Sequence, residues 1–458
     1  MYIDTRVPYR LGTAKLAPLP NEWDLVNDCF PPKVQEAMAI ARKHLKDEPI
    51  AMLYIRRRGE ERNTALILSS YAPALENKWR KAIKELYECF EHEEGLIAEI
   101  VDYHVHNPPL PKSITTAEVD LHQVAALFDD HEWMTVDVLR WYSPVRQETW
   151  PTIVITARDI GKDSWWSTKI PAVKQYVKDY GLDLDVVLLF MDKLLPGACG
   201  HAEGQNGLWE SVCRGLYYYT AIGDSVGIQN MDGSESLGCR VLVEDGRQFG
   251  VIACRNFRRG LESTQTGLIG LNVQSPSSYD DCVVKKNQAD NQKSEKLEIS
   301  NLGKISAVSS SGSWLTDWGI YEMHRLDTIR RAPEVWARVK NGKTYQVKKF
   351  GRSTGLQKGT INAPSSIINS KHIEYAHMQG ACTMASARCI VSKDMPFCLP
   401  GDYGACVQEN DSGAILGLCV AYNEATKVSY MTPMATIVGE INDAVASKIK
   451  EPKETQLE

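Results

Sequence analysis

The sequence predicts an α+β protein of more than one domain, in which a duplicated α/β domain precedes an all-β domain. The chain has 458 residues, which is too long for one ordinary hydrophobic core. A strand–strand–helix–strand pattern occurs twice in its first part, and helical periodicity fades after about residue 206. We therefore expect domains at 1–205 and 206–448, followed by a charged tail at 449–458.

The first repeat unit, residues 34–103, changes from the two-residue period of strands to the 3.6-residue period of helices. Apolar runs at 51–55 and 65–68 predict two strands on either side of a basic turn. The apolar face of the following helix is Trp79, Ile83, Leu86 and Phe90. A strand at 96–103 is expected to end the unit, and a helix at 34–45 to begin it.

The second unit, residues 121–191, repeats this order with a helix, two strands, a helix and a strand. Its second helix has the apolar face Trp166, Ile170, Val173 and Val177, each about 87 residues after its counterpart in the first unit. One unit alone is expected to bury little apolar surface, so the two copies are predicted to pair their apolar faces. The pattern dictates no function.

The second half has short apolar segments separated by turn sequences such as Asp245-Gly246, Asn341-Gly342 and Ser412-Gly413. This spacing is typical of an all-β barrel or sandwich. Residues 274–311 are rich in Ser, Lys, Asp and Asn and poor in apolar side chains, so a long mobile loop is expected there.

Composition excludes several classes of function. The apolar fraction of 43% and the charged fraction of 24% are those of a globular protein, and the net charge of -6 argues against a nucleic-acid partner. No apolar run is long enough for a membrane span. Residues 1–21 contain no signal peptide, which favours a cytoplasmic or nuclear location with most of the 12 cysteines reduced. No cofactor loop or metal-ligand pattern is found.

Four segments of the second half are the most informative about the fold and the candidate site. A strand, Gln248–Phe257, contains Arg255 near its end, and Asp317-Trp-Gly-Ile320 follows it. Then come Gly-Arg-Ser-Thr-Gly-Leu-Gln-Lys-Gly-Thr-Ile-Asn at 351–362 and Phe-Cys-Leu-Pro-Gly-Asp-Tyr-Gly-Ala at 397–405. In this order they resemble the active-site segments of the chymotrypsin superfamily of serine proteases, and most of all the intracellular trypsin-like proteins of fungi. The resemblance covers about residues 222–440 and implies a chymotrypsin-like double β-barrel.

The resemblance also implies a role for each site position. Arg255 stands where the family has its histidine base, Asp317 keeps the aspartate, and Tyr403 replaces the serine nucleophile. Gly401, Asp402 and Tyr403 would supply the backbone amide nest for an oxyanion. A guanidinium cannot accept a proton, and a phenol oxygen on a rigid ring overshoots the substrate carbonyl. Because losing either serine or histidine costs about a million-fold in turnover, ordinary serine proteolysis is not expected.

Three functions stay open from the sequence. The first is a degenerate pseudoprotease that binds a protein or peptide partner, with Arg255 paired to Asp317 and stacked under Tyr403. The second is a repurposed, non-proteolytic enzyme of small-molecule metabolism that uses Tyr403 and Arg255. The third is a residual hydrolase that uses Ser412 or Cys254, although a hairpin turn explains Ser412 better.

Overall fold

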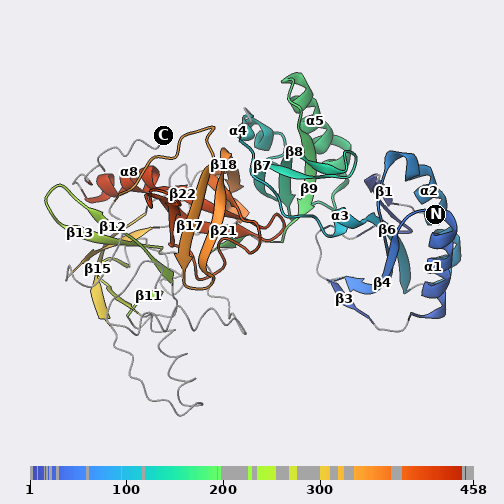
Figure 1. Cartoon of the computed structure of the whole chain (residues 1–458), viewed down its shortest axis with the longest axis horizontal. Coiled ribbons are helices and arrows are strands. Elements are labelled where there is room, and N and C mark those ends of the chain that lie inside the picture. The colour runs from blue at the N-terminus through green and yellow to red at the C-terminus, as the bar shows by residue number, and fades with distance from the viewer. Residues whose placement is uncertain are drawn as a thin grey trace, which may run out of the picture. The chain divides into compact units, whose positions relative to one another are not determined.

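The computed structural model describes residues 4–7, 9–14, 16, 19, 23–26, 30–57, 61–93, 95–115, 119–192, 194–196, 225–229, 235–253, 268–275, 300–309, 318–323, 335–372, 384–445 and 449. The chain divides into two units, whose elements are labelled in Figure 1. Unit 1 comprises 1–111, 123–133 and 138–192, and unit 2 comprises 112–122, 134–137 and 193–458. Among the described residues, no helix is both long enough and apolar enough to cross a membrane.

The first part of unit 1 is a six-stranded sheet in the order β1-β2-β6-β5-β4-β3. Its strands are β1 (Asp4–Val7), β2 (Arg10–Gly12), β3 (Trp23–Leu25), β4 (Ile50–Arg57), β5 (Asn63–Ser69) and β6 (Leu96–Asp102). Its helices are α1 (Pro32–His44), the 3₁₀ turn η1 (Pro73–Leu75), α2 (Glu76–Phe90) and the short α3 (Tyr103–His106). Strands β5 and β6 pair in parallel, and α2 provides the crossover that parallel pairing requires.

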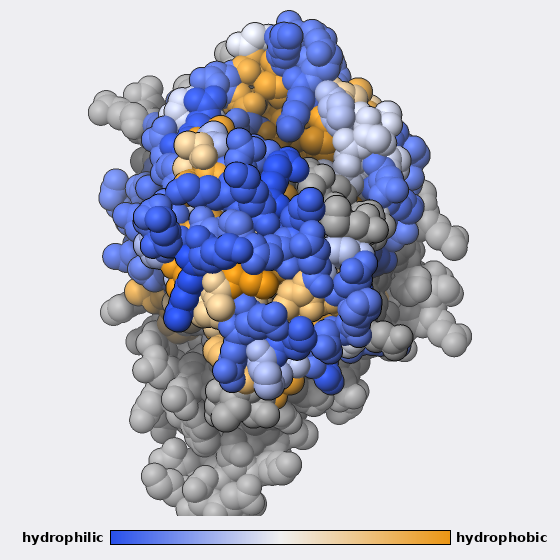
Figure 2. Space-filling view, turned by 90° about the vertical axis from the view of Figure 1, so that its right-hand side faces the viewer, coloured by the Kyte–Doolittle hydropathy of each residue, from blue (hydrophilic) through white to orange (hydrophobic). Residues whose placement is uncertain are grey.

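The predicted helix face of the first copy is confirmed, because Trp79, Ile83, Leu86 and Phe90 are all buried. With α1 and Leu11 of β2 they pack into one core, which among the described residues includes none from the second copy. The predicted pairing of the two apolar faces therefore does not form this core, and residues that precede the repeat unit help to bury the helix face. The polar sides of the helices stay outside, and the face shown in Figure 2 is mostly hydrophilic.

The second copy has the elements α4 (Leu121–Ala126), β7 (Trp133–Ser143), β8 (Glu148–Ala157), the π turn η2 (Trp165–Lys169), α5 (Ile170–Asp179) and β9 (Asp185–Phe190). Strands β8 and β9 pair in parallel, as β5 and β6 do. The predicted face is wrong at one position, because Trp165 is fully buried and Trp166 only half-buried. The amide of Ile170 bonds to the carbonyl of Trp165, and this wider π turn shifts the register by one residue.

Unit 2 begins with a closed six-stranded barrel in the order β11-β12-β13-β16-β15-β14. Its strands are β11 (Ser225–Ile228), β12 (Glu235–Leu242), β13 (Gln248–Ile252), β14 (Asn272–Ser275), β15 (Ser300–Val308) and β16 (Gly319–Met323). The loop predicted at 274–311 is wrong for its last part, because β15 completes the barrel there. Leu302, Ile305 and Ala307 are buried between more exposed neighbours, an alternation that the polar composition of the segment hides.

The remaining strands of unit 2 form a second ring. They are β17 (Tyr345–Gly351), β18 (Gly355–Asn369), β19 (Met384–Val391), β20 (Cys406–Glu409), β21 (Ile415–Asn423) and β22 (Val428–Pro433). Neighbours pair in the order β17-β20-β21-β22-β19-β18, and β17 also pairs with β18, which closes the ring. The short β10 (Leu195–Pro196) pairs with β21, and α8 (Met434–Val445) packs against strands of both rings.

Two predicted boundaries differ from the structure. Residues 112–122 and 134–137 group with unit 2, although 1–205 was expected to be a separate domain. Thr135 and Val136, at the start of β7, pair with Ile368 and Ile367 of β18. In the predicted charged tail, Ile449 is buried and bridges to Val243. Such pairings join residues far apart in sequence, so they cannot be predicted from a local sequence pattern.

A buried network of hydrogen bonds links β7 to strands β21 and β22 of the second ring. Asp137 is fully buried, and its Oδ2 accepts hydrogen bonds from the Tyr430 hydroxyl at 2.8 Å and the Thr135 hydroxyl at 3.1 Å. The amide of Asn423 donates to the Thr135 hydroxyl at 3.0 Å. Burial raises the pKa of Asp137 to about 6, since a buried carboxylate loses its hydration.

Asp137 should therefore make stability depend on pH. Its pKa is higher in the folded chain, so its contribution is fully present below about pH 4 and is lost as pH rises through about 6. Asp137→Asn is expected to remove this dependence and to raise the free energy of unfolding at pH 7 by up to about 3 kcal/mol. Denaturant titrations between pH 4 and 7 measure this, with the exposed Asp183→Asn as control. Parallel pH profiles for wild type and Asp137→Asn would contradict it.

Candidate functional site

The loop before β20 contains the predicted amide nest, and its central carboxylate is completely buried. Asp402 Oδ2 lies 2.7 Å from the Lys349 ammonium, and neither side chain has exposed surface. The same carboxylate accepts the Thr354 hydroxyl at 2.7 Å and the backbone amides of Ser353 at 2.6 Å, Thr354 at 3.1 Å and Leu399 at 3.1 Å. This set of charge-assisted bonds fixes the loop to the turn between β17 and β18.

Lys349 is the cation in this pair because of the strand on which it lies. In β17 the inward positions are Tyr345, Val347, Lys349 and Gly351, and all of them are buried. Burial lowers the pKa of Lys349, and the neighbouring Asp402 opposes this shift by stabilising the charged form. The ammonium also donates to the Thr354 hydroxyl at 2.6 Å.

Two glycines allow the loop to pass close to other backbone. Gly401 has φ +96° and Gly404 has φ +82°, values that side chains rarely adopt. A Cβ at Gly404 would lie 2.8 Å from the Ala253 amide nitrogen and 2.9 Å from the Ser236 carbonyl oxygen, both in the first barrel. The Ser236 hydroxyl donates to the Gly401 carbonyl at 3.0 Å, and its amide donates to the Tyr403 carbonyl at 3.2 Å. The loop is therefore held from both barrels.

Tyr403, which the sequence analysis predicts to replace the serine nucleophile, is only 1% exposed. It is among the largest fully buried side chains of the chain. Its neighbour Gly404 donates its amide to the Cys419 carbonyl at 2.9 Å, which ties the turn to β21. The phenol is thus part of the protein interior and not of an open cleft.

Cysteine pairing adds a covalent tie to this loop. Cys398 and Cys419 form a disulfide between the start of the loop and β21. Among the other described cysteines, Cys89, Cys239, Cys389 and Cys406 are free thiols. The pairing of Cys398 with Cys419 was not predicted, because a separation of 21 residues in sequence gives no local signal.

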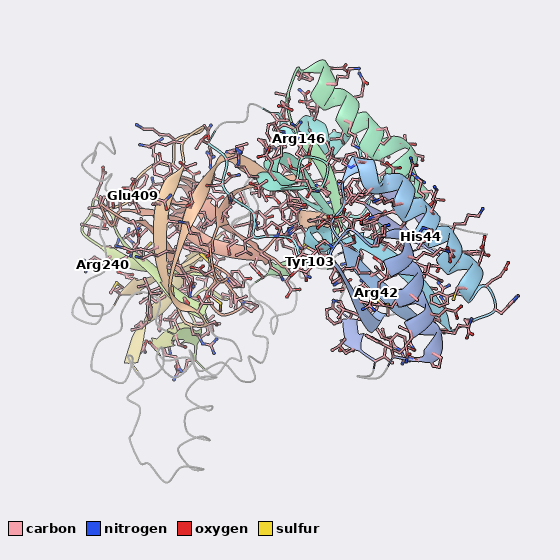
Figure 3. The ribbon with its side chains drawn as sticks, turned by 45° about the vertical axis from the view of Figure 1, so that its right-hand side comes forward. Arg42, His44, Tyr103, Arg146, Arg240 and Glu409 are labelled. Atoms are coloured by element: carbon pink, nitrogen blue, oxygen red, sulfur yellow. A yellow bond between two sulfur atoms is a disulfide. The ribbon has the colours of Figure 1, made fainter. Side chains whose placement is uncertain are left out.

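The other predicted site residues divide into two groups. Arg255, Asp317 and Cys254 lie outside the described residues, so their proposed pairing stays a prediction. Ser412 is exposed in the hairpin between β20 and β21, where its hydroxyl donates at 2.6 Å to Glu409, which is labelled in Figure 3. Its partner is a carboxylate and not the imidazole that a nucleophilic serine needs, which fits the predicted turn.

Sequence reasoning missed the residues that fix the loop, namely Lys349, Ser353 and Thr354. One signal was available, because Lys349 occupies an inward position in the alternation of β17 and a lysine there needs a buried partner. Within the described part of the chain, no group of three or more His, Cys, Asp or Glu side chains is placed to hold a metal ion.

The chain is similar to several solved structures of serine proteases. No family model matches the chain, and no curated protein matches it. Over about half its length the chain is similar to chymotrypsin-like serine proteases. A glutamic-acid-specific serine protease has 13% identity and a TM-score of 0.29 over 50% of this chain and 100% of its own. Thermobifida fusca protease A has 14% identity and a TM-score of 0.26 over 51% and 100%, and Cellulomonas bogoriensis chymotrypsin 14% and 0.28 over 50% and 97%.

The buried ion pair can be tested with a double-mutant cycle. Asp402→Asn leaves the Lys349 charge buried and unpaired, so we expect a loss of about 3–5 kcal/mol in the free energy of unfolding. Adding Lys349→Met removes that charge, and most of the loss should be recovered. Denaturant titration of the full chain measures both effects.

The matched control is the ion pair between Lys43 of α1 and Glu85 of α2, whose side chains are 63% and 34% exposed. Glu85→Gln should cost less than about 1 kcal/mol, because solvent screens an exposed pair. The double variant would contradict the assignment if it proved as unstable as Asp402→Asn alone.

Proposed function

We propose that this protein is a catalytically degenerate trypsin-like protein that binds a protein or peptide partner without cleaving it. The observation that carries the proposal is the burial of Tyr403, which is 1% exposed. Acyl transfer needs a nucleophile whose oxygen reaches the substrate carbonyl and a neutral base beside it. A phenol enclosed in the protein interior meets neither requirement.

The loop around Tyr403 is built to keep its shape. Its carboxylate pairs with Lys349 inside the protein, Cys398 is bonded to Cys419, and Gly404 approaches the first barrel too closely for a side chain. A rearrangement that exposed Tyr403 would have to break several of these contacts together. A rigid loop without a working nucleophile favours recognition over chemistry, since pre-organised surfaces bind with little loss of conformational entropy.

The enzymatic alternatives have less support. A repurposed enzyme acting through Tyr403 and Arg255 requires a phenol hydroxyl in an open pocket, and burial of Tyr403 argues against it. A residual hydrolase at Ser412 requires an imidazole partner, whereas that hydroxyl donates to Glu409. Binding of a protein or peptide, in the cytoplasm or nucleus, therefore remains our proposal.

Loss of serine chemistry can be tested with an active-site probe. The wild-type chain should not react with a fluorophosphonate, because a buried phenol and a guanidinium cannot form the nucleophile and base. The paired change Arg255→His with Tyr403→Ser should gain reactivity, measured by gel fluorescence. Wild-type labelling that disappears in Ser412→Ala would contradict the proposal in favour of hydrolysis at that serine.

Partner binding needs its own measurement. A peptide selected from a random display library on the full chain should protect the turn at 351–354 and the loop at 399–405 from hydrogen exchange. The comparison variant is Asp402→Asn, in which the loop is released and the affinity for the selected peptide should fall. Protection confined to unit 1 would contradict this location for the binding surface.

A further inference from the structure

Arg388 of β19 is a buried cation that has no carboxylate partner among the described residues. The side chain is 2% exposed, and its Nη1 donates to the Ala363 carbonyl at 2.7 Å. Its Nη2 donates to the Asn341 side-chain oxygen, and its Nε has no hydrogen-bond partner. No acidic side chain among the described residues forms an ion pair with it. Burial lowers the pKa of Arg388, yet a guanidinium stays charged at physiological pH.

An uncompensated buried charge is costly, and two other buried cations of this chain have carboxylate partners. Lys349 is paired with Asp402, and Arg57 lies 2.8 Å from the fully buried Glu99. Two neutral hydrogen-bond acceptors solvate the Arg388 guanidinium only in part, because they carry no net negative charge. A negative charge supplied from outside the chain would complete the arrangement.

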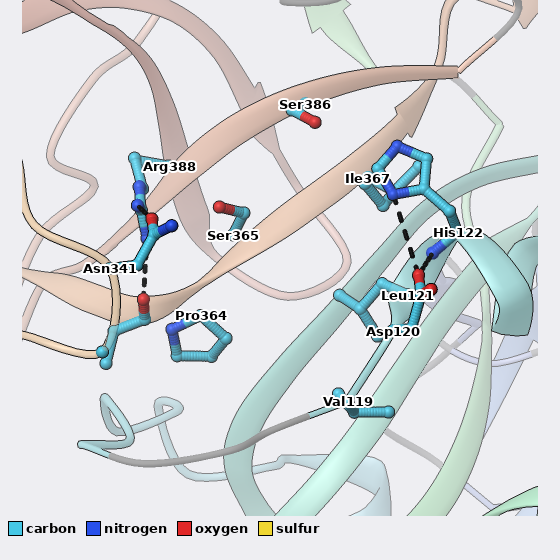
Figure 4. Close-up of a pocket in the computed structure, with 12 residues that line it drawn as sticks. Val119, Asp120, Leu121, His122, Asn341, Pro364, Ser365, Ile367, Ser386 and Arg388 are labelled. Carbon is cyan, nitrogen blue, oxygen red and sulfur yellow. Dashed lines mark hydrogen bonds and ion pairs between the residues drawn. The ribbon is translucent and has the colours of Figure 1, made fainter.

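Arg388 lines a pocket of about 520 Å³, a size suited to a small organic molecule (Figure 4). The pairing of β18 with β19 places Ser365 opposite Arg388 and Ile367 opposite Ser386. Alternate residues of a strand share a face, so these four side chains form one surface of the pocket. The serines add two hydroxyls to this surface.

The remaining walls supply apolar surface and a second charged group. Leu121 and Pro364 line the pocket, whereas Asn341 borders it beside Arg388. Asp120 and His122 lie at the other end in Figure 4, with 3.9 Å between Asp120 Oδ1 and His122 Nδ1. The Asp120 carboxylate disfavours a ligand with more than one negative charge, because like charges repel.

Asp137 is a buried acid of strand β7, which pairs with β18, and it forms no ion pair with Arg388. Its Oδ2 accepts hydrogen bonds from Tyr430 and Thr135 instead. The residues that lie between the pocket positions, Ser366 and Ala387, point to the opposite face of the sheet. The charge of Arg388 therefore stays available to a ligand.

We propose that this pocket binds a small organic monocarboxylate. Arg388 holds the carboxylate, the hydroxyls of Ser365 and Ser386 donate to it, and the apolar walls cover the body of the ligand. One guanidinium matches one negative charge, and a carboxylate carries one. The pocket contains no residue of the 399–405 loop, so this inference goes beyond the proposed function and can fail or hold independently of it.

Calorimetry and thermal unfolding of the full chain test the proposal with benzoate and its neutral analogue benzamide, at matched ionic strength. Benzoate should bind and raise the melting temperature, whereas benzamide should not, because only the anion compensates Arg388. Arg388→Gln, which keeps an amide donor for Ala363, should weaken benzoate binding about tenfold or more. Arg388→Lys should retain part of the affinity, and the exposed Arg42→Met on α1 all of it (Figure 3).

Equal effects of benzoate and benzamide would overturn the proposal, as would full benzoate affinity in Arg388→Gln. Stabilisation by inorganic phosphate without any by benzoate would overturn the assignment to carboxylates. If Arg388→Gln does not fold, benzoate binding is measured in Ser386→Phe instead. This substitution fills the pocket and leaves the guanidinium in place. Loss of benzoate binding in that variant supports the proposal, and retention contradicts it.

Discussion

The fully buried ion pair between Lys349 and Asp402 determines the form of the whole loop region. Inside the protein neither charge can lose the other without a large electrostatic cost, so the β17–β18 turn and the 399–405 loop behave as one piece. The amides of Ser353 and Leu399 complete the coordination of the carboxylate. The disulfide between Cys398 and Cys419 and the turns at Gly401 and Gly404 lie in the same loop and add to this constraint.

The same constraint makes the shape of the loop independent of the side chain at position 403. Its shape depends on Asp402 and on glycines at positive φ, and neither depends on the identity of residue 403. A serine there would be a candidate nucleophile, whereas Tyr403 fills the interior and adds apolar contact area. The shape of the loop and the chemistry of the side chain at position 403 therefore depend on different atoms.

Buried charged side chains in this protein have two kinds of hydrogen-bond partner, charged and neutral. In unit 1, Glu99 accepts from Arg10 at 2.7 Å and Arg57 at 2.8 Å, and these two guanidinium groups hold the pKa of Glu99 at about 2 although burial opposes the shift. In unit 2, Arg388 borders a pocket and has only neutral partners. The first arrangement is complete within the chain, whereas in the second we propose that an external carboxylate supplies the negative charge.

The sequence by itself determined the repeated strand–strand–helix–strand units, the change to an all-β second half and the Gly401–Gly404 motif, because each depends on local periodicity or on adjacent residues. Only the tertiary structure decided that β15 completes a barrel within a polar segment, that β7 contributes residues to both units and that Trp165 replaces Trp166 in the core. It also decided which buried charges are paired. Strand pairing and ion pairing depend on contacts between residues far apart in the chain. The energy of these contacts cannot be predicted from a local sequence pattern.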